Sequence, residues 1–576
     1  MSAYDVIVVG SGAGGSPVAA VLAEAGHRVL VLEKGGRYQE SDFVKDEIAV
    51  VRRGAFTPSA AAEPMVQETV GAAQAGSGAP TSLFWNGSLV GGSSVLMSGF
   101  MMRMKPSDFR QLSSFGAVQG ASVADWPIDY GELEPWYAEV ERQVGLSGRV
   151  VPHGRHLAEP RSTPGFPQPP LTEHPLAQRV DAVCAKLGLN SVPLPRSVLS
   201  RDVPDAPGQA RHACDYNGYC GSFGCAVGAK GSGLAAFVHR AEATGRCDVI
   251  SKARVTRLET DASGAVRAAH WIDRDGRANR TEASVFVVAC QALESARLLL
   301  LSRGPKHPRG LGNSSGQVGR HLLFCSFGAG WGDFALARDP ALASSEPFVN
   351  RIVQDWYWYD PSDPRRRAGR DDVPPAPGLV KAGTLNFLRV HPNPILAAVT
   401  QALWDERPDY VPLWGAALKE RLRWYFHDVM HLRFETFSDW LPHDGCWMRL
   451  SDTVKDKLGL PVCHVRAVNH PRSLQAVRDL VARGVEVLEA MGARKVRTPD
   501  SFGGPSTNLI AGTCRFGDDP RTSVLDRDCR AHDTPNLWVT DGSFMPSGGS
   551  VPYTMTIYAN ALRVASRIHE TLDRGR

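Results

Sequence analysis

The 576-residue chain lacks any apolar run approaching the ~18 residues of a membrane span, so no transmembrane helix is predicted. It also lacks a strong excess of one charge. A formal net charge of +4 is too small for a chain of this size to indicate a nucleic-acid-binding protein. No basic and apolar leader precedes the first strand pattern, so no export signal is expected. The 11 cysteines, an odd number, favour reduced thiols over a disulfide framework. We therefore expect a cytoplasmic protein.

The composition that is present is globular. Hydrophobic residues make up 43% of the chain and charged residues 22%, which excludes a disordered or fibrous protein. The length allows about three domains, or two large ones. The 57 glycines are more than an average share, and they predict many tight turns or close approaches to a ligand.

The N-terminal region has the pattern strand, glycine turn, helix, strand, acid. Residues 5–9 (DVIVV) predict a buried parallel strand, and the turn GSGAGG follows directly. A helix is predicted over 16–26 and a second strand over 28–32, which closes with Glu33. Such a turn brings backbone N–H groups and the helix N-terminus to a pyrophosphate, and the acid accepts hydrogen bonds from a ribose. The pattern predicts a dinucleotide site without separating FAD from NAD.

Motifs later in the chain resemble the glucose-methanol-choline (GMC) oxidoreductases, which use FAD. The resemblance runs over nearly the whole length, and the gluconate-, fructose- and sorbitol-dehydrogenase-like branch resembles the chain most. The segments that carry it are GGSS (91–94), ALESARLLL (292–300), GTCRFGDDPRTSVLDRDCR (512–530), NLWVTDGSFMPSGG (536–549) and TMTIYANALRVA (554–565).

The resemblance implies an α/β fold class. It has a discontinuous, Rossmann-like, three-layer FAD-binding domain and an inserted α+β substrate domain built on an antiparallel sheet. We predict the FAD-binding domain over 1–110, 205–330 and 505–576, and the substrate domain over 111–204 and 331–504.

The family's cofactor-binding positions can be carried over one at a time. The matching residues are Gly10, Gly12, Gly15, Glu33, Gly92, Ser93, Val255, Asp541, Gly542, Thr554 and Met555. Thr554 and Met555 begin the last helix, whose N-terminus stabilises the negative charge of reduced flavin. Some relatives tether FAD covalently through a His, and Leu96 occupies that position here, so non-covalent FAD is implied.

The sequence departs from the family at the catalytic position. Family members normally carry a His three residues before the Gly of GTxRxG, and this residue removes the hydroxyl proton of an alcohol. Leu509 stands there, with Asn508 beside it, and the second expected His or Asn is missing from the stretch 550–553 (SVPY).

Three explanations stay open. Tyr553 could act as the acid–base group, because the helix N-terminus favours its phenolate. A His of the inserted domain could replace the missing base, with His443, His464 and His470 as candidates. Alternatively, the substrate needs no strong base.

Two weaker patterns concern metals and membranes. Cys214, Cys220 and Cys225 have the spacing C-x5-C-x4-C, one residue longer than a cluster motif of some dehydrogenase relatives. We favour reduced thiols and predict no metal ligands. Residues 411–430 have apolar positions at helical spacing with basic residues between them. An amphipathic helix of the inserted domain explains this pattern better than membrane contact.

The predicted function is FAD-dependent oxidation, with hydride transfer to the flavin, of an alcohol or another activated C–H of a fairly large or hydrophobic organic substrate. The electron acceptor is O2 or a redox partner. Two alternatives remain: a flavin-containing, non-redox lyase or decarboxylase on the same fold, and a dehydrogenase subunit that passes electrons through an iron–sulfur cluster.

Overall fold

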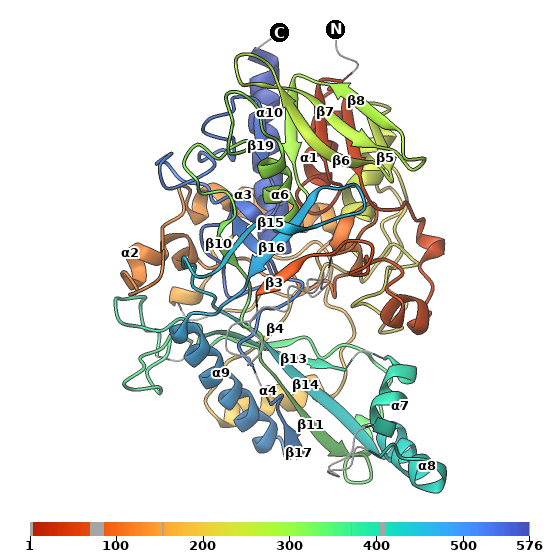
Figure 1. Ribbon diagram of the computed structural model, residues 1–576. Helices are drawn as coiled ribbons and strands as arrows, with labels where there is room; N and C mark the ends of the chain where they lie inside the picture. Colours follow the sequence, from red (N-terminus) through yellow and green to blue (C-terminus); the bar gives the residue numbers. More distant parts are fainter. Residues whose placement is uncertain are drawn as a thin grey trace.

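The computed structural model describes residues 4–68, 86–152, 155–369, 371–390, 392–403, 411–500 and 502–574. Its upper part holds a parallel sheet and both chain ends, and its lower part holds an antiparallel sheet (Figure 1). The chain passes between the two parts several times, so each is assembled from separated segments.

A five-stranded parallel sheet forms the centre of the upper part, with strand order β19-β9-β1-β2-β5. Val6 of β1 lies between Val29 of β2 and Val285 of β9. All residues of β1, β2, β9 and β19 are buried, as the continuous apolar runs predict. The strands are β1 (Val6–Val9), β2 (Val29–Glu33), β5 (Cys247–Ser251), β9 (Val285–Val288) and β19 (Leu537–Val539).

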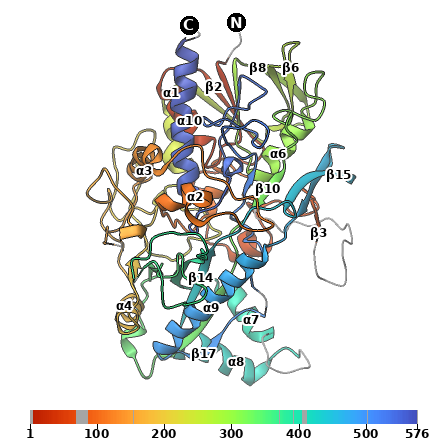
Figure 2. The ribbon, with the colours of Figure 1, turned by 90° about the vertical axis from the view of Figure 1, so that its left-hand side faces the viewer.

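Helices and a second small sheet surround this sheet. Helix α1 (Ser16–Glu24) packs against the C-terminal helix α10 (Thr554–Arg574), and α10 also packs against α3 (Tyr130–Val144). Figures 1 and 2 show α1 and α10 side by side in the upper half. The antiparallel strands β6 (Arg254–Thr260), β7 (Val266–Ile272) and β8 (Ala278–Glu282) lie beside α6, which spans Ala292–Leu301.

The lower part is built on a six-stranded sheet in which all neighbouring strands are antiparallel, with order β17-β11-β14-β13-β12-β4. Helix α9 (Pro471–Ala490) packs against its central strands and buries an apolar face that includes Val477 and Leu480. The strands are β4 (Ser191–Pro193), β11 (Ala329–Ala335), β12 (Arg351–Val353), β13 (Gly383–Arg389), β14 (Val429–Ser438) and β17 (Arg494–Arg497). The predicted fold class is confirmed.

The exact domain ranges stay a prediction. The six strands fall in or at the edge of 111–204 and 331–504, as proposed for the substrate domain. However, α3 packs against α10 in the upper part, and β15 (Trp447–Lys455) and β16 (Pro461–Arg466) contact α6 there. Strand β16 also pairs with β3 (Val66–Glu68), so the two parts exchange short segments.

The predicted helix within 411–430 forms, but no residue of α8 (Gly415–Arg423) is buried, and the Trp414 side chain before it is 82% exposed. No helix among the described residues is both long and apolar enough to cross a bilayer. The remaining elements are η1 (Glu40–Asp42), η2 (Ile48–Arg52), η3 (Gly92–Leu96), η4 (Pro106–Arg110), α2 (Gln111–Phe115), η5 (Arg155–Leu157), α4 (Leu176–Lys186), η6 (Leu234–Val238), α5 (His239–Ala243), β10 (Arg320–Leu323), η7 (Pro340–Leu342), α7 (Pro394–Leu403), η8 (Trp424–Asp428), β18 (Ala511–Thr513) and η9 (Gly542–Phe544).

Candidate active site

A cavity of about 760 Å³ lies between the two parts of the molecule. One end is formed where β1, β2 and β9 finish, at Gly10, Glu33 and Ala289. The other end is formed by β14 of the antiparallel sheet. Ligands of parallel α/β sheets bind at the carboxyl ends of the strands, so the first end is the expected cofactor end. We call the two ends the nucleotide end and the sheet end.

Glycines let the backbone approach closely at the nucleotide end. A Cβ atom on Gly10, which has φ +96°, would lie 2.4 Å from the Ala289 carbonyl oxygen, and one on Gly15 would lie 1.9 Å from the Gly10 oxygen. These two glycines are needed for packing within the fold. At Gly12 a Cβ would meet only the Gly92 Cα, at 3.8 Å, and both residues line the cavity. Gly12 therefore keeps space open for a ligand.

Glu33 is fixed at the end of β2 by three hydrogen bonds. Its carboxylate accepts from the Ser11 N–H at 3.0 Å, the Ser11 hydroxyl at 2.7 Å and the Gly35 N–H at 2.7 Å. The side chain is buried but lines the cavity. Two carboxylate oxygens offer about four acceptor sites, so one remains for the predicted ribose hydroxyl.

Most other predicted cofactor residues also line this cavity. They are Gly92, Ser93, Val255, Asp541, Gly542 and Thr554. Met555 is buried in the core and does not line it. Asp541 accepts hydrogen bonds from Ser295 and Ser543, and burial raises the pKa of its carboxyl above the usual range despite these bonds. Leu96 lines the cavity at the position where tethered relatives carry His.

Two buried polar atoms of the cavity wall fit a bound cofactor. The side-chain nitrogen of Gln291 and the side-chain oxygen of Asn86 have no hydrogen-bond partner among the described residues. Both residues line the cavity, and Gln291 caps the N-terminus of α6. Buried polar groups are rarely left without partners, so a polar ligand is expected to satisfy them. Together with the glycine turn and Glu33, they match the adenine dinucleotide of FAD.

The sheet end combines aromatic and charged side chains. Strand β14 contributes Arg433, Glu435, Thr436 and Phe437, and Phe100 and Phe327 add apolar surface. The Glu435 carboxylate accepts a hydrogen bond from the Asn386 amide at 3.1 Å and lies 3.5 Å from the Arg433 guanidinium. Sequence reasoning missed Arg433 and Glu435, because no motif surrounds them and only strand pairing brings them to the cavity.

Two of the four predicted catalytic residues line the cavity and two do not. Leu509 and Asn508 are part of the wall, and the Asn508 side-chain oxygen accepts from the Ser506 hydroxyl at 2.8 Å. His464 lies on β16 outside the cavity wall, with its Nε2 3.1 Å from a Glu68 carboxylate oxygen. The structure therefore gives His464 no contact with the cavity.

Tyr553 is buried and is not part of the cavity wall. Its hydroxyl donates to the Phe324 carbonyl oxygen at 2.6 Å. Burial, with nearby Cys325 and acidic groups, raises the pKa of Tyr553 well above its usual value. This direction favours the neutral phenol and so does not support the expectation that the helix N-terminus favours the phenolate. The catalytic role of Tyr553 stays a prediction that this geometry does not support.

A buried polar network holds the loop before α10, and sequence reasoning missed it too. The Lys381 ammonium lies 2.7 Å from an Asp108 carboxylate oxygen and donates to the Gly548 carbonyl at 3.0 Å. The Tyr357 hydroxyl donates to the same carboxylate at 2.7 Å and accepts from the Ser550 N–H at 3.2 Å. Burial opposes the charge of Lys381, but the neighbouring carboxylates outweigh it and raise the pKa of Lys381. The network positions the helix N-terminus.

The three cysteines lie together in a partly buried region outside the cavity wall. Cys214, Cys220 and Cys225 pack against the cluster that contains Leu199 and Phe348. Burial raises the pKa of the Cys214 thiol to about 12 when no metal is bound. A metal ion deprotonates the thiols that bind it, so this pKa does not test the cluster alternative, and the expectation of reduced thiols stays a prediction.

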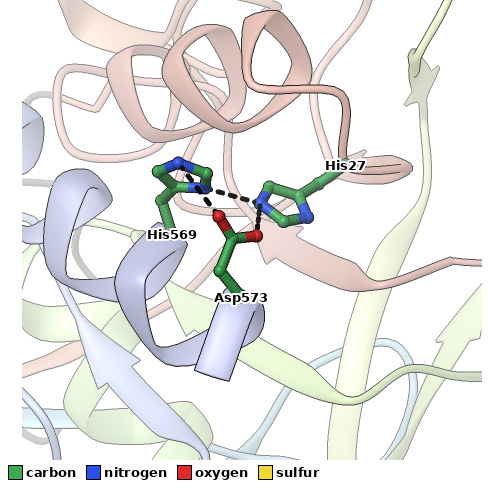
Figure 3. A group of neighbouring side chains, drawn as sticks. All are labelled: His27, His569 and Asp573. Carbon is green, nitrogen blue, oxygen red and sulfur yellow. Dashed lines mark hydrogen bonds and ion pairs between the residues drawn. The ribbon is translucent and has the colours of Figure 1, made fainter. Parts of the chain in front are cut away.

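One further group of metal-ligand side chains lies at the outer ends of α1 and α10 (Figure 3). The His27 Nε2 is 2.9 Å from the His569 Nδ1, and Asp573 lies 4.0 Å from His27 and 3.5 Å from His569. Two His and one carboxylate suit zinc chemically. The direct hydrogen bond between the imidazoles already satisfies the facing nitrogens, so we assign this group a structural role in joining the two helices.

Comparisons with known proteins agree with the site. Two models of the GMC oxidoreductase family match the chain, an N-terminal one over residues 4–324 and a C-terminal one over residues 442–561. The chain is similar to the 6'''-hydroxyparomomycin C oxidase of Streptomyces lividus, at 31% identity over 99% of this chain and 92% of that protein. It is also similar to the 2-methyl-1,2-propanediol dehydrogenase of Mycolicibacterium austroafricanum, at 28% identity over 98% and 95%.

Solved structures show the same fold at low sequence identity. The pyridoxine 4-oxidase of Mesorbium loti superposes with a TM-score of 0.60 at 19% identity, covering 98% of this chain and 99% of that one. A formate oxidase variant of Aspergillus oryzae gives a TM-score of 0.63 at 14% identity, covering 99% and 100%. The glycine turn, the cavity and the family matches together show that the chain belongs to the GMC oxidoreductase family and is an FAD-dependent oxidoreductase.

Proposed function

We propose that the protein oxidises a hydroxyl group of a ring-containing polar alcohol, such as an amino sugar or a cyclic polyol. The observation that carries this proposal is the composition of the sheet end. Phe100, Phe327 and Phe437 offer apolar faces against which a ring can stack, while Arg433 and Glu435 offer hydrogen bonds to several polar substituents. The 6'''-hydroxyparomomycin C oxidase among the relatives supports this substrate class.

The proposal narrows the sequence-based expectation of a fairly large or hydrophobic substrate. Aromatic surface supports a substrate of some size, whereas the ion pair of Arg433 and Glu435 favours one with polar groups. FAD, held by Gly12, Glu33 and Asp541, would supply the two-electron oxidant. These protein groups bind and orient FAD, and the sheet end orients the alcohol against it.

An anaerobic substrate screen tests the proposal. Amino sugars and cyclic polyols should bleach the flavin absorbance, whereas methanol-sized alcohols and sterols should do so far more slowly. Bleaching by sterols in preference to sugars would contradict the proposed substrate class. Conversion of a substrate without bleaching would instead indicate the non-redox alternative, and iron in metal analysis would indicate the electron-transfer alternative.

The same preparation tests how FAD is held. Leu96 lacks a nucleophilic atom at the position of the family's tethering His, so we propose non-covalent binding. Acid precipitation should leave the yellow chromophore in the supernatant. Flavin that stays with the pellet would show a covalent bond to another residue.

A further inference from the structure

Strand β14 contributes Arg433 and the continuous stretch Glu435 to Phe437 to the cavity wall. Arg433, Glu435 and Phe437 are two residues apart and therefore project from the same face of the sheet. Glu435 is 19% exposed, so its carboxylate is accessible from the cavity but largely removed from bulk water. This is the position of a group that meets a bound substrate.

The neighbours of Glu435 fix its orientation. Asn386 lies directly opposite on β13, is fully buried, and donates its amide hydrogen to one carboxylate oxygen at 3.1 Å. Arg433 lies 3.5 Å from the other oxygen, and its guanidinium sits over the Trp331 ring at 5.5 Å. With a single side-chain hydrogen bond at normal length, lone pairs remain to accept a proton.

Glu435 is the carboxylate that the described cavity wall places at the sheet end. The other carboxylates of this wall, those of Glu33, Glu294 and Asp541, lie at the nucleotide end and interact with protein groups there. Leu509 cannot accept a proton, and Tyr553 and His464 do not line the wall.

The chain also connects Glu435 to the start of α10. The segment 324–328 runs between them. On the strand side, the Thr436 N–H donates to the Gly328 carbonyl and the Thr436 hydroxyl donates to the Ser326 carbonyl. On the helix side, the Tyr553 hydroxyl at the start of α10 donates to the Phe324 carbonyl. The start of α10, where the sequence predicts contact with the flavin, and the strand that carries Glu435 are thus joined through five consecutive residues.

We propose that Glu435 is the proton acceptor of the reaction and replaces the His that is missing at Leu509. This inference rests on the proposed alcohol oxidation. The substrate O–H bond breaks and its proton passes to the Glu435 carboxylate, which becomes a carboxylic acid. The C–H bond breaks with its electron pair, which leaves as hydride, and the carbon–oxygen double bond forms, so the alcohol loses two electrons. FAD, when bound, would supply the two-electron acceptor for this hydride. Glu435 returns its proton to solvent before the next turnover.

Glu435→Gln tests the assignment, because it removes the base with little change in shape. General-base catalysis is typically worth about 10²–10⁴ in rate, so anaerobic flavin reduction by the best alcohol of the screen should slow by at least about 100-fold. The acidic limb of the wild-type pH profile of kcat/KM should disappear. The FAD content should match that of wild type, and the Tm should stay within a few degrees of it. The dissociation constant of an unreactive deoxy analogue of the substrate, titrated by flavin absorbance, should stay within about threefold of the wild-type value.

Chemical rescue separates a base from a structural group. Formate added to Glu435→Ala should raise its rate of flavin reduction by at least about tenfold over the same variant without formate, since a small carboxylate can occupy the vacated space. Glu489→Gln, at an exposed position of α9, is the matched control and should behave as wild type. His464→Asn should also retain its rate; loss there, with Glu435→Gln unaffected, would move the chemistry to His464.

The outcomes distinguish the two proposals. Wild-type flavin that no alcohol bleaches would overturn the proposed function and this assignment with it. Bleaching by an alcohol at an unchanged rate in Glu435→Gln would overturn the assignment alone. If Glu435→Gln bound the analogue tenfold more weakly than wild type but kept its kcat, Glu435 would bind the substrate without accepting its proton. This result would also overturn the assignment.

Discussion

The two ends of the cavity are built in different ways. At the nucleotide end, backbone groups and glycines define the surface, and a Cβ at Gly10 or Gly15 would collide with backbone atoms. At the sheet end, side chains from β14 and from the loop that contains Leu509 define the surface. Backbone-built surfaces tolerate few substitutions, because the backbone cannot move aside. A side-chain surface can exchange its chemical groups while the fold stays the same. The family cofactor site is therefore retained where the usual catalytic His has been lost.

The largest effect on cofactor binding is expected at Gly12, at the nucleotide end of the cavity. The Cβ of Gly12→Ala fits the protein but occupies space where a pyrophosphate approaches, so FAD affinity should fall by about 10- to 100-fold, or about 1.4–2.7 kcal/mol. Titration of the apoprotein with FAD would measure this. Gly165→Ala, where an added Cβ meets nothing within 4 Å, is the control.

Gly15→Ala provides the contrast, because its Cβ would overlap the Gly10 oxygen. This variant should lose stability even without FAD. Normal FAD affinity in Gly12→Ala, or a fully stable Gly15→Ala apoprotein, would show that the two glycines do not divide the binding and packing roles in this way.

A pH effect of similar size is expected at Glu294, also at the nucleotide end. Burial opposes its charge, but Arg297, Lys34 and Arg254 outweigh this and lower the pKa of Glu294 to about 2. The folded pKa is below that of the unfolded chain, so the stabilisation is present above about pH 4.5 and is lost as the pH falls toward 2. This shift corresponds to at most about 3 kcal/mol.

Thermal unfolding of the holoenzyme with excess FAD between pH 7 and pH 3 would measure the Glu294 effect. Glu294→Gln should be less stable than wild type at pH 7, and its Tm should fall less steeply with acidification. Parallel curves for the two proteins would contradict the assigned pKa shift.

A rescue at the sheet end would sharpen the comparison. Leu509→His restores the usual family base on the cavity wall, so in the Glu435→Gln background it should raise the rate of flavin reduction by about tenfold or more. In the wild-type background the gain should be smaller, because Glu435 already accepts the proton. Leu509→Met, which supplies no base, is the control. Equal rates of flavin reduction for Leu509→His and Leu509→Met in the Glu435→Gln background would show that the substrate hydroxyl does not lie near position 509.

The smallest effect on turnover is expected at Tyr553. Tyr553→Phe removes the hydrogen bond to the Phe324 carbonyl, which should cost about 1–2 kcal/mol of folding stability. Turnover should change by less than about threefold, since the hydroxyl does not line the cavity. Unfolding curves and kcat would be measured together. A loss of tenfold or more in kcat, with FAD bound and stability retained, would restore Tyr553 as the acid–base group expected from the sequence.

The sequence by itself determined the fold class and the FAD cofactor, through family motifs spread over the chain, and it predicted which residues bind FAD. The dinucleotide site depends on a short local pattern: the apolar run of β1, the glycine turn after it and Glu33 at the end of β2 lie within about 30 residues. The sequence also showed that the usual base is missing at Leu509. Only the tertiary structure decided which groups share the sheet end, because Glu435, Asn386 and Leu509 come from segments far apart in the chain. Only the tertiary structure showed that the Tyr553 hydroxyl donates to the Phe324 carbonyl. The burial that raises the pKa of Tyr553 comes from packing between distant segments, which no local sequence pattern contains.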